Sequence, residues 1–211
     1  MNHRNQSLNL ISRSGLLIPL VFFAAIFALP VMAEEQMNPG QNNTAPEFNR
    51  TVANYETPDV TVVRADGKKL SFIKELDDGR PVIMNFVFAS CAAICPMLSH
   101  LFAKVQTKLE KDSQNFHLVS ISIDPENDTP AILSEYAKKF GAGPNWNFYT
   151  GTVETSLAIQ KAFNVYRGDK MNHSSTILIR YAPGKPWSRL EGFISADAVI
   201  SEYRNLGAAT K

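Results

Sequence analysis

The stretch FVFASCAAICPM, residues Phe86–Met97, contains both cysteines of this 211-residue chain. An apolar run of strand length ends just before the two thiols, and apolar residues with helical spacing follow them. We therefore expect Cys91 and Cys95 to lie on the turn between a buried strand and an amphipathic helix.

The segments around this turn predict a strand–helix–strand unit. Residues 81–89 and 116–124 are apolar runs of strand length. Such a unit requires two parallel strands joined by a right-handed crossover. The cysteines would then lie at the carboxyl end of a central strand, where ligands of open α/β sheets bind. The apolar residues at helical spacing between the two runs are Met97, Leu98, Leu101, Phe102, Val105 and Leu109.

The rest of the chain predicts an α/β fold with a central mixed sheet flanked by helices. An N-terminal β-hairpin is expected around Asp66 and Gly67, the pair typical of a tight turn between two strands. Asp128, Thr129 and Pro130 combine a helix cap with a proline at the first helical position. We further expect a strand at 146–149, a helix at 153–163, a hairpin within 175–194 and a closing helix at 195–207.

Residues 1–33 have the pattern of a secretory signal peptide. Two arginines precede an apolar run that closes with Val31 and Ala33, small residues suited to cleavage. An uncleaved membrane anchor is the alternative, because the run is nearly long enough to span a bilayer. Residues 34–55, polar and rich in Asn and Pro, are expected to form a flexible tether, and residues 56–211 the folded domain. Both alternatives predict an exported, periplasmic protein, soluble or tethered to the inner membrane.

The charge composition argues against a nucleic-acid partner. The chain has 21 basic and 20 acidic side chains, a formal net charge of +1 and 45% apolar residues. A near balance of charge provides no field for gathering polyanions, and this apolar content is typical of a globular protein.

If the protein is exported, its two cysteines can form a disulfide, because oxidising compartments favour disulfides. A structural disulfide stabilises chiefly by closing a long loop, and Cys91 and Cys95 would close almost none. Backbone N–H groups at a helix N-terminus lower the pKa of a thiol, which favours redox exchange or metal binding. We therefore expect a reactive pair, with a structural disulfide as the alternative.

Three longer stretches resemble the signature segments of the Sco/SenC family, thioredoxin-fold copper proteins of cytochrome c oxidase assembly. They are FVFASCAAICPMLSH, VSISIDPENDTPAILSEYAKKFG followed by FYTGT, and NHSSTILI, and the resemblance extends over about residues 59–203. It implies a thioredoxin-like fold and a copper chaperone. The expected partner is a cytochrome c oxidase subunit, or another copper-carrying or thiol protein. We expect a monomer.

The resemblance also implies the copper ligands, which are Cys91, Cys95 and a distant histidine, His173. Two thiolates and one imidazole suit Cu(I), and they accommodate Cu(II) if a further ligand joins. From the residues alone, His173 lies in a polar loop and is predicted to be exposed, where most histidines are simply solvated. One position departs from the family, which usually has aspartate before this histidine where the chain has Asn172. The missing charge weakens the attraction for Cu(II), docking to a basic partner, or both.

Two other functions remain open. A thiol-disulfide oxidoreductase would attack a partner disulfide with one cysteine and resolve the mixed disulfide with the other, without copper as cargo. The Asn172 departure adds weight to this alternative. A thiol peroxidase would need a threonine and an arginine around the attacking cysteine, and neither flanks Cys91.

Further polar and sulfur-containing side chains are assigned structural roles and left out of the predicted site. Met97 belongs to the apolar stripe of the helix, which predicts core packing. His100 lies off the cysteine side of that helix, which indicates a surface or packing role. His117 opens a strand, and Asp124 with Pro125 is typical of a turn that ends a strand.

Overall fold

The computed structural model describes residues 48–112 and 114–209. The predicted signal or anchor segment, residues 1–33, and residues 34–47 of the predicted tether lie outside these ranges. Among the described residues, no helix combines the length and the apolar character that crossing a bilayer requires.

The predicted strand–helix–strand unit surrounds the cysteines. Strand β4 (Val82–Val87) leads into helix α2 (Ile94–Lys111), and strand β5 (His117–Ser122) follows. The two strands pair in parallel along their whole length. Every side chain of both strands is buried, as expected for parallel strands that helices cover on both faces.

Six further strands complete one mixed sheet within the described residues. They are β1 (Phe48–Ala53), β2 (Thr61–Arg64), β3 (Lys69–Ser71), β6 (Trp146–Thr150), β7 (Thr176–Arg180) and β8 (Trp187–Gly192). The strand order is β1-β8-β7-β4-β5-β6-β2-β3, with β4, β5 and β6 parallel and the other pairs antiparallel. The predicted hairpin is present as β2 and β3, and Gly67 in its turn has φ 85°, a conformation that glycine adopts at low cost.

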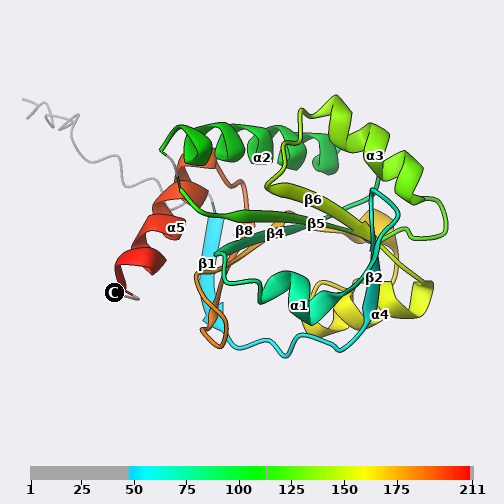
Figure 1. The fold of residues 1–211 in the computed structure, drawn as a ribbon, viewed down its shortest axis with the longest axis horizontal. Coiled ribbons are helices and arrows are strands. Elements are labelled where there is room, and N and C mark those ends of the chain that lie inside the picture. Colours follow the sequence, from blue (N-terminus) through cyan, green and yellow to red (C-terminus); the bar gives the residue numbers. More distant parts are fainter. Residues whose placement is uncertain (1–47, 113, 210–211) are drawn as a thin grey trace, which may run out of the picture. The chain divides into compact units, whose positions relative to one another are not determined.

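Helices cover both faces of this sheet (Figure 1). Helices α2, α3 (Pro130–Lys139) and α5 (Ala196–Ala209) contribute to the apolar core on one face. Helices α1 (Phe72–Leu76) and α4 (Val153–Ala162) contribute to the core on the other, and a short 3-10 helix, η1 (Lys170–Asn172), precedes β7. The predicted α/β, thioredoxin-like fold is confirmed.

Helix α3 begins as its sequence predicts. Pro130 is its first residue, and the Thr129 side-chain oxygen accepts a hydrogen bond from the Ile132 N–H at 3.3 Å. This cap satisfies one of the free N–H groups at the helix start.

Residues 48–53 form an edge strand, whereas the sequence places them in the tether. Strand β1 pairs antiparallel with β8, and Arg50 donates hydrogen bonds of 2.7 and 2.8 Å to the Glu202 carboxylate of α5. Four of its six side chains are exposed, so it lacks the apolar alternation that would predict a strand. Residues 48–53, which lie before the predicted domain boundary at residue 56, therefore belong to the sheet.

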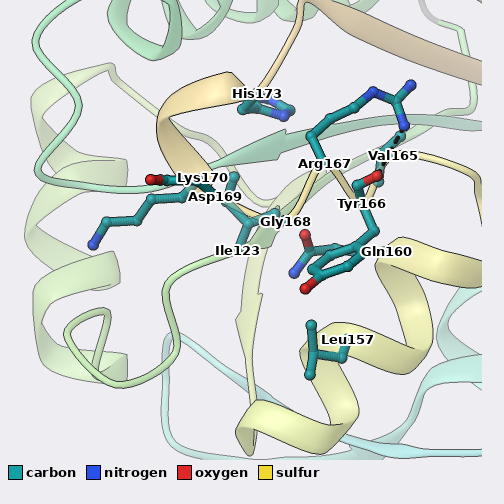
Figure 2. A pocket seen from close by; sticks show the side chains of 10 residues that line it. All are labelled: Ile123, Leu157, Gln160, Val165, Tyr166, Arg167, Gly168, Asp169, Lys170 and His173. Atoms are coloured by element: carbon teal, nitrogen blue, oxygen red, sulfur yellow. Dashed lines mark hydrogen bonds between the residues drawn. The ribbon is translucent and has the colours of Figure 1, made fainter.

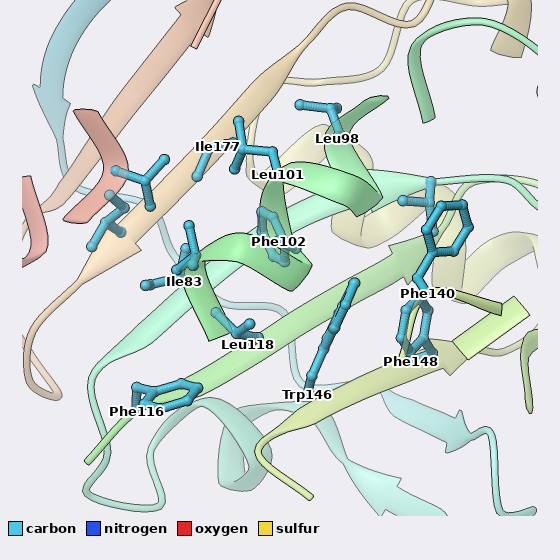
Figure 3. Packing of buried hydrophobic residues seen from close by; sticks show 14 of the residues in the cluster. Ile83, Leu98, Leu101, Phe102, Phe116, Leu118, Phe140, Trp146, Phe148 and Ile177 are labelled. Carbon is cyan, nitrogen blue, oxygen red and sulfur yellow. The ribbon is translucent and has the colours of Figure 1, made fainter. Parts of the chain in front are cut away.

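Apolar packing fixes α2 over the sheet. Phe102 of α2 is fully buried, and its ring centroid lies 5.7 Å from that of Trp146 (Figure 3). Ile83 of β4 and Leu118 of β5 belong to the same cluster. Because fully burying one such side chain stabilises a protein by about 1.5–3 kcal/mol, this packing fixes the position of α2 and of the cysteines at its amino end.

Two adjacent residues of α3 provide a matched test of this core. Leu133 is 0% exposed and Ile132 is 45% exposed. Leu133→Ala should lower the free energy of unfolding by about 2–5 kcal/mol, because it removes buried apolar contacts and leaves a cavity. Ile132→Ala should change it by about 0.5 kcal/mol or less. Denaturant unfolding followed by circular dichroism measures both, and equal losses would contradict the packing of α3.

Candidate functional site

Cys91 and Cys95 lie where β4 gives way to α2. The Cys91 backbone N–H donates to the Phe88 carbonyl at 3.1 Å, and Cys95 is in the first turn of α2. Both are free thiols, with Cys91 partly exposed and Cys95 fully buried. The two thiols lie close enough for each to shift the pKa of the other, so the pair can close a disulfide or share an ion.

The amino end of α2 is directed at the Cys91 sulfur. Ala93 precedes the helix and offers no side-chain cap. Burial opposes ionisation of Cys91, but hydrogen bonds from the backbone N–H groups of Cys95, Ala93 and Ile94 outweigh it and hold the pKa of Cys91 below its ordinary value. The predicted lowering of a thiol pKa is therefore confirmed for Cys91.

Cys95 has the opposite character. Burial raises the pKa of Cys95 to about 12, and Cys91 and the Asp128 carboxylate act in the same direction. At neutral pH Cys95 is therefore a protonated, enclosed thiol, while Cys91 is the more acidic and more accessible one. This asymmetry is that of an attacking thiol and a resolving thiol.

A buried carboxylate, Asp128, holds the segment that leads to the cysteines. Its two oxygens accept hydrogen bonds from the Ala89 N–H at 3.1 and 3.2 Å, and the Ser122 hydroxyl donates to it at 2.6 Å. Burial raises the pKa of Asp128, although these donors oppose the shift. Sequence alone assigns Asp128 to the start of α3. The hydrogen bond between Asp128 and Ala89 joins residues 39 positions apart, so no local sequence pattern could have predicted it.

His173 lies directly after η1 and packs against β4. Its Nε2 is 3.1 Å from the Phe86 carbonyl oxygen. Because a carbonyl can only accept, Nε2 carries the proton and Nδ1 keeps its lone pair. Burial lowers the pKa of His173, and repulsion from Arg167 adds to the effect, so the ring is neutral at physiological pH. The ring is thus half-buried and docked on the strand, whereas the sequence predicts an exposed loop histidine.

The three predicted ligands are not gathered into one cluster. Phe86, which holds His173, is near the carboxyl end of β4, and Cys91 follows that end. Within the described ranges, no three or more His, Cys, Asp or Glu side chains lie close enough together to hold a metal ion. The paired sulfurs have the chemistry that a soft ion prefers, and the Nδ1 lone pair of His173 has the chemistry of a third donor. The joint ligand set stays a prediction.

Two of the side chains assigned structural roles lie on the exposed side of α2. The prediction that Met97 packs in the core is wrong, because its side chain is 49% exposed. Helical period identifies the apolar stripe but not where neighbouring elements stop covering it. His100 is exposed, and its ring meets the edge of Phe140 at a centroid distance of 5.0 Å, which agrees with a surface or packing role.

The other two lie on or after β5. His117 is fully buried, as a structural role requires, and burial lowers the pKa of His117 to about 4. Asp124 does lie in the turn that follows β5, but it is only 5% exposed, and Lys170 donates to it at 2.6 Å. These two residues are 46 positions apart, so no local pattern indicates the ion pair.

Comparison with known sequences identifies related proteins. The sequence model of the SCO1/SenC family matches residues 53–206. The SCO1 protein homolog of Bacillus subtilis (strain 168) is 32% identical over 105 residues, which are 49% of this chain and 53% of that protein. The SCO2-like protein of Rickettsia felis is 31% identical over 117 residues, which are 51% of this chain and 56% of that protein. The chain thus spans about half the length of these curated relatives.

Two solved structures share the fold. One is BsSco, a member of the Sco family of cytochrome c oxidase assembly proteins in which a disulfide switch was identified. It has a TM-score of 0.63 and 27% identity, over 75% of this chain and 96% of that one. The other is Arabidopsis thaliana ScoI with copper bound, with a TM-score of 0.59 and 26% identity over 69% of this chain and 94% of that one.

The unequal acidity of the two thiols predicts which one reacts first. At neutral pH iodoacetamide should alkylate Cys91 before Cys95, because the thiolate is the nucleophile and Cys95 has a pKa of about 12. The Cys91 rate should rise with pH through a midpoint below that of an ordinary cysteine. Mass spectrometry of the reduced protein, with Cys91→Ala and Cys95→Ala as single-thiol references, measures both rates. Faster alkylation of Cys95 would contradict the assignment.

Proposed function

Because the chain belongs to the SCO1/SenC family, we propose that it is an exported copper chaperone of cytochrome c oxidase assembly. It holds copper through Cys91, Cys95 and His173 and delivers it to a cytochrome c oxidase subunit, or to another copper-carrying or thiol protein. Residues 1–33 direct export and are then removed or kept as an inner-membrane tether. The folded part, a monomer, works in the periplasm.

The observation that carries the proposal is the thiol pair that follows the carboxyl end of β4, the strand on which the neutral imidazole of His173 is also docked through the Phe86 carbonyl. Two thiolate sulfurs and one imidazole nitrogen are the donor set that Cu(I) prefers, and a further ligand would accommodate Cu(II). The related ScoI of Arabidopsis thaliana, whose structure has copper bound, supports the same cargo.

Copper loading requires both thiol protons to leave. Cys91 ionises readily because the amino end of α2 stabilises its thiolate. Cys95, with a pKa of about 12, keeps its proton at neutral pH, and in copper loading the cation takes the proton's place. His173 is already neutral and offers Nδ1 without losing a proton. Affinity should therefore fall as the pH falls, because protons compete with copper for both sulfurs.

Asn172 adjusts the preference between the two copper ions. The side chain is exposed and directly precedes His173. An amide can accept a hydrogen bond but cannot neutralise a cation. A carboxylate at this position would attract Cu(II) more than Cu(I), because the divalent charge interacts more strongly. Its absence therefore favours Cu(I) as the cargo.

The asymmetry of the thiols favours a second function, thiol-disulfide exchange. The Cys91 thiolate would attack one sulfur of a partner disulfide, forming a mixed disulfide and releasing the partner's other sulfur as a thiolate. Cys95 would then give its proton to the partner thiolate released in the first step and attack the Cys91 sulfur, which closes the Cys91–Cys95 disulfide and releases the second partner thiolate. The partner gains the two electrons that the pair loses, and copper takes no part.

Cu(I) competition separates the two functions. The reduced full chain should take up about one Cu(I) from a chromogenic chelator, and Cys91→Ala or Cys95→Ala should abolish tight binding because each removes a soft ligand. His173→Ala should weaken Cu(I) binding but leave disulfide exchange largely intact. His100→Ala, which removes an exposed histidine from α2, is the matched control and should bind as the unmodified chain does.

Failure to bind Cu(I) would identify the second function just as specifically. Should the reduced chain fail to take Cu(I) from a chelator of modest affinity while both cysteines still exchange with a partner disulfide, copper would not be the cargo. The oxidoreductase function would then stand in its place.

A further inference from the structure

The turn that carries His173 has little packing of its own. No residue of η1 is buried, and Met171 is 72% exposed. A cavity of about 120 Å³ lies beside this segment, lined in part by Leu157, Gln160 and Tyr166 (Figure 2). Apolar burial therefore contributes little to fixing the turn.

Internal hydrogen bonds nevertheless make the turn a stiff unit. The Asp169 side chain accepts from the Met171 N–H at 2.8 Å, and its carbonyl accepts from the Asn172 N–H at 3.0 Å. The His173 N–H donates to the Lys170 carbonyl at 3.1 Å. An anchor that fixes Lys170 therefore also fixes the backbone from which the His173 ring extends.

The Lys170 side chain is such an anchor. It points away from Tyr166 and Gln160 (Figure 2), and its Nζ lies 2.6 Å from an Asp124 carboxylate oxygen. Asp124 is itself held, because its other oxygen accepts from the Asn127 side-chain amide at 2.9 Å. The Asp124 side chain is 6% exposed and that of Lys170 is 35% exposed. Removing one partner of a pair whose other member is buried costs more than breaking an exposed pair.

Lys170 also reaches the segment that carries the cysteines. Its Nζ lies 5.6 Å from the centroid of the Phe88 ring, a cation–π contact. The Phe88 carbonyl accepts the Cys91 N–H, and Phe88 belongs to the same apolar cluster as Cys95. One side chain therefore bridges the histidine turn, the turn after β5 and the cysteine segment.

We propose that Lys170 is a positioning residue that holds His173 within reach of the cysteine pair, an inference that rests on the copper binding proposed above. Lys170 acts through His173 and not on the metal, because its own positive charge repels a copper ion. Removing the Lys170 charge should therefore weaken copper binding if Lys170 positions His173, and strengthen it if direct charge repulsion dominates. Without the anchor, the stiff turn can move as a unit relative to the sheet, its position must be fixed when His173 binds, and the copper affinity falls.

Cu(I) competition on the reduced full chain tests the direction in which removing Lys170 changes the Cu(I) affinity. Lys170→Gln should weaken binding about tenfold, a loss typical of residues that orient a metal ligand. Lys170→Arg should retain most of the affinity, because a guanidinium can pair with Asp124 and lie over Phe88. Lys108→Gln removes an exposed 2.8 Å pair with Asp197 and is the matched control, which should bind as the unmodified chain does.

A double-mutant cycle tests whether Lys170 affects copper binding through His173. In the His173→Ala background, Lys170→Gln should cause no further loss, because its effect passes through the missing ring. A second tenfold loss in that background would overturn the positioning role. Tighter Cu(I) binding by Lys170→Gln in the unmodified background would overturn it as well, since direct charge repulsion predicts that increase in affinity.

A metal-free measurement separates this inference from the copper proposal. Solvent exchange of the His173 Nε2–H, followed by nitrogen-15 NMR, should be slow in the unmodified chain and in Lys170→Arg, because the Phe86 carbonyl holds that proton. Lys170→Gln should accelerate it several-fold. This pattern in a chain that binds no Cu(I) would refute the copper proposal and support the anchor. Unchanged exchange in Lys170→Gln would refute the anchor.

Discussion

The site depends on the interaction between the amino end of α2 and the Cys91 sulfur. The helix begins without a side-chain cap, so its first N–H groups need an acceptor, and the Cys91 sulfur supplies one. Strand β4 is buried throughout and α2 packs on the sheet through Phe102, so neither element can shift without losing apolar burial. The unequal acidity of the two thiols follows from this junction, since one sulfur lies at the helix end and the other within its first turn.

One thiol pair can thus serve two chemistries. Both begin with the Cys91 thiolate, and both need Cys95 to give up a proton that burial holds tightly. A partner disulfide takes electrons from the pair, whereas copper takes the place of its protons. The two functions differ in what they require of His173, because only a metal uses its nitrogen as a donor. Under the proposed copper function, the position of the histidine turn is therefore what distinguishes a copper site from a thiol pair alone.

The parts of the fold that the sequence predicts are those with local causes. The strand–helix–strand unit follows from apolar period, the hairpin from Gly67, and the start of α3 from Thr129 and Pro130. The parts it does not predict depend on distant neighbours. Strand β1 is a polar edge strand whose ladder comes from β8, and the exposure of Met97 depends on where other elements stop covering α2.

The same distinction holds within the site. The cysteine pair, its place at a strand end and the lowered pKa of Cys91 can be predicted from residues that lie together in the chain. The contact of Asp128 with Ala89 and that of Lys170 with Asp124 join residues 39 and 46 positions apart, and no pattern in either segment indicates them. His173 is a predicted ligand through family resemblance, because a lone loop histidine has no spacing that relates it to Cys91.

The most direct test of the proposed copper site is X-ray absorption at the copper edge on the reduced chain loaded with one equivalent of Cu(I). We expect copper to have two sulfur neighbours and one imidazole nitrogen, and His173→Ala to remove the nitrogen while both sulfurs remain. An identical spectrum for the unmodified chain and His173→Ala, with sulfur neighbours alone, would contradict the three-residue site.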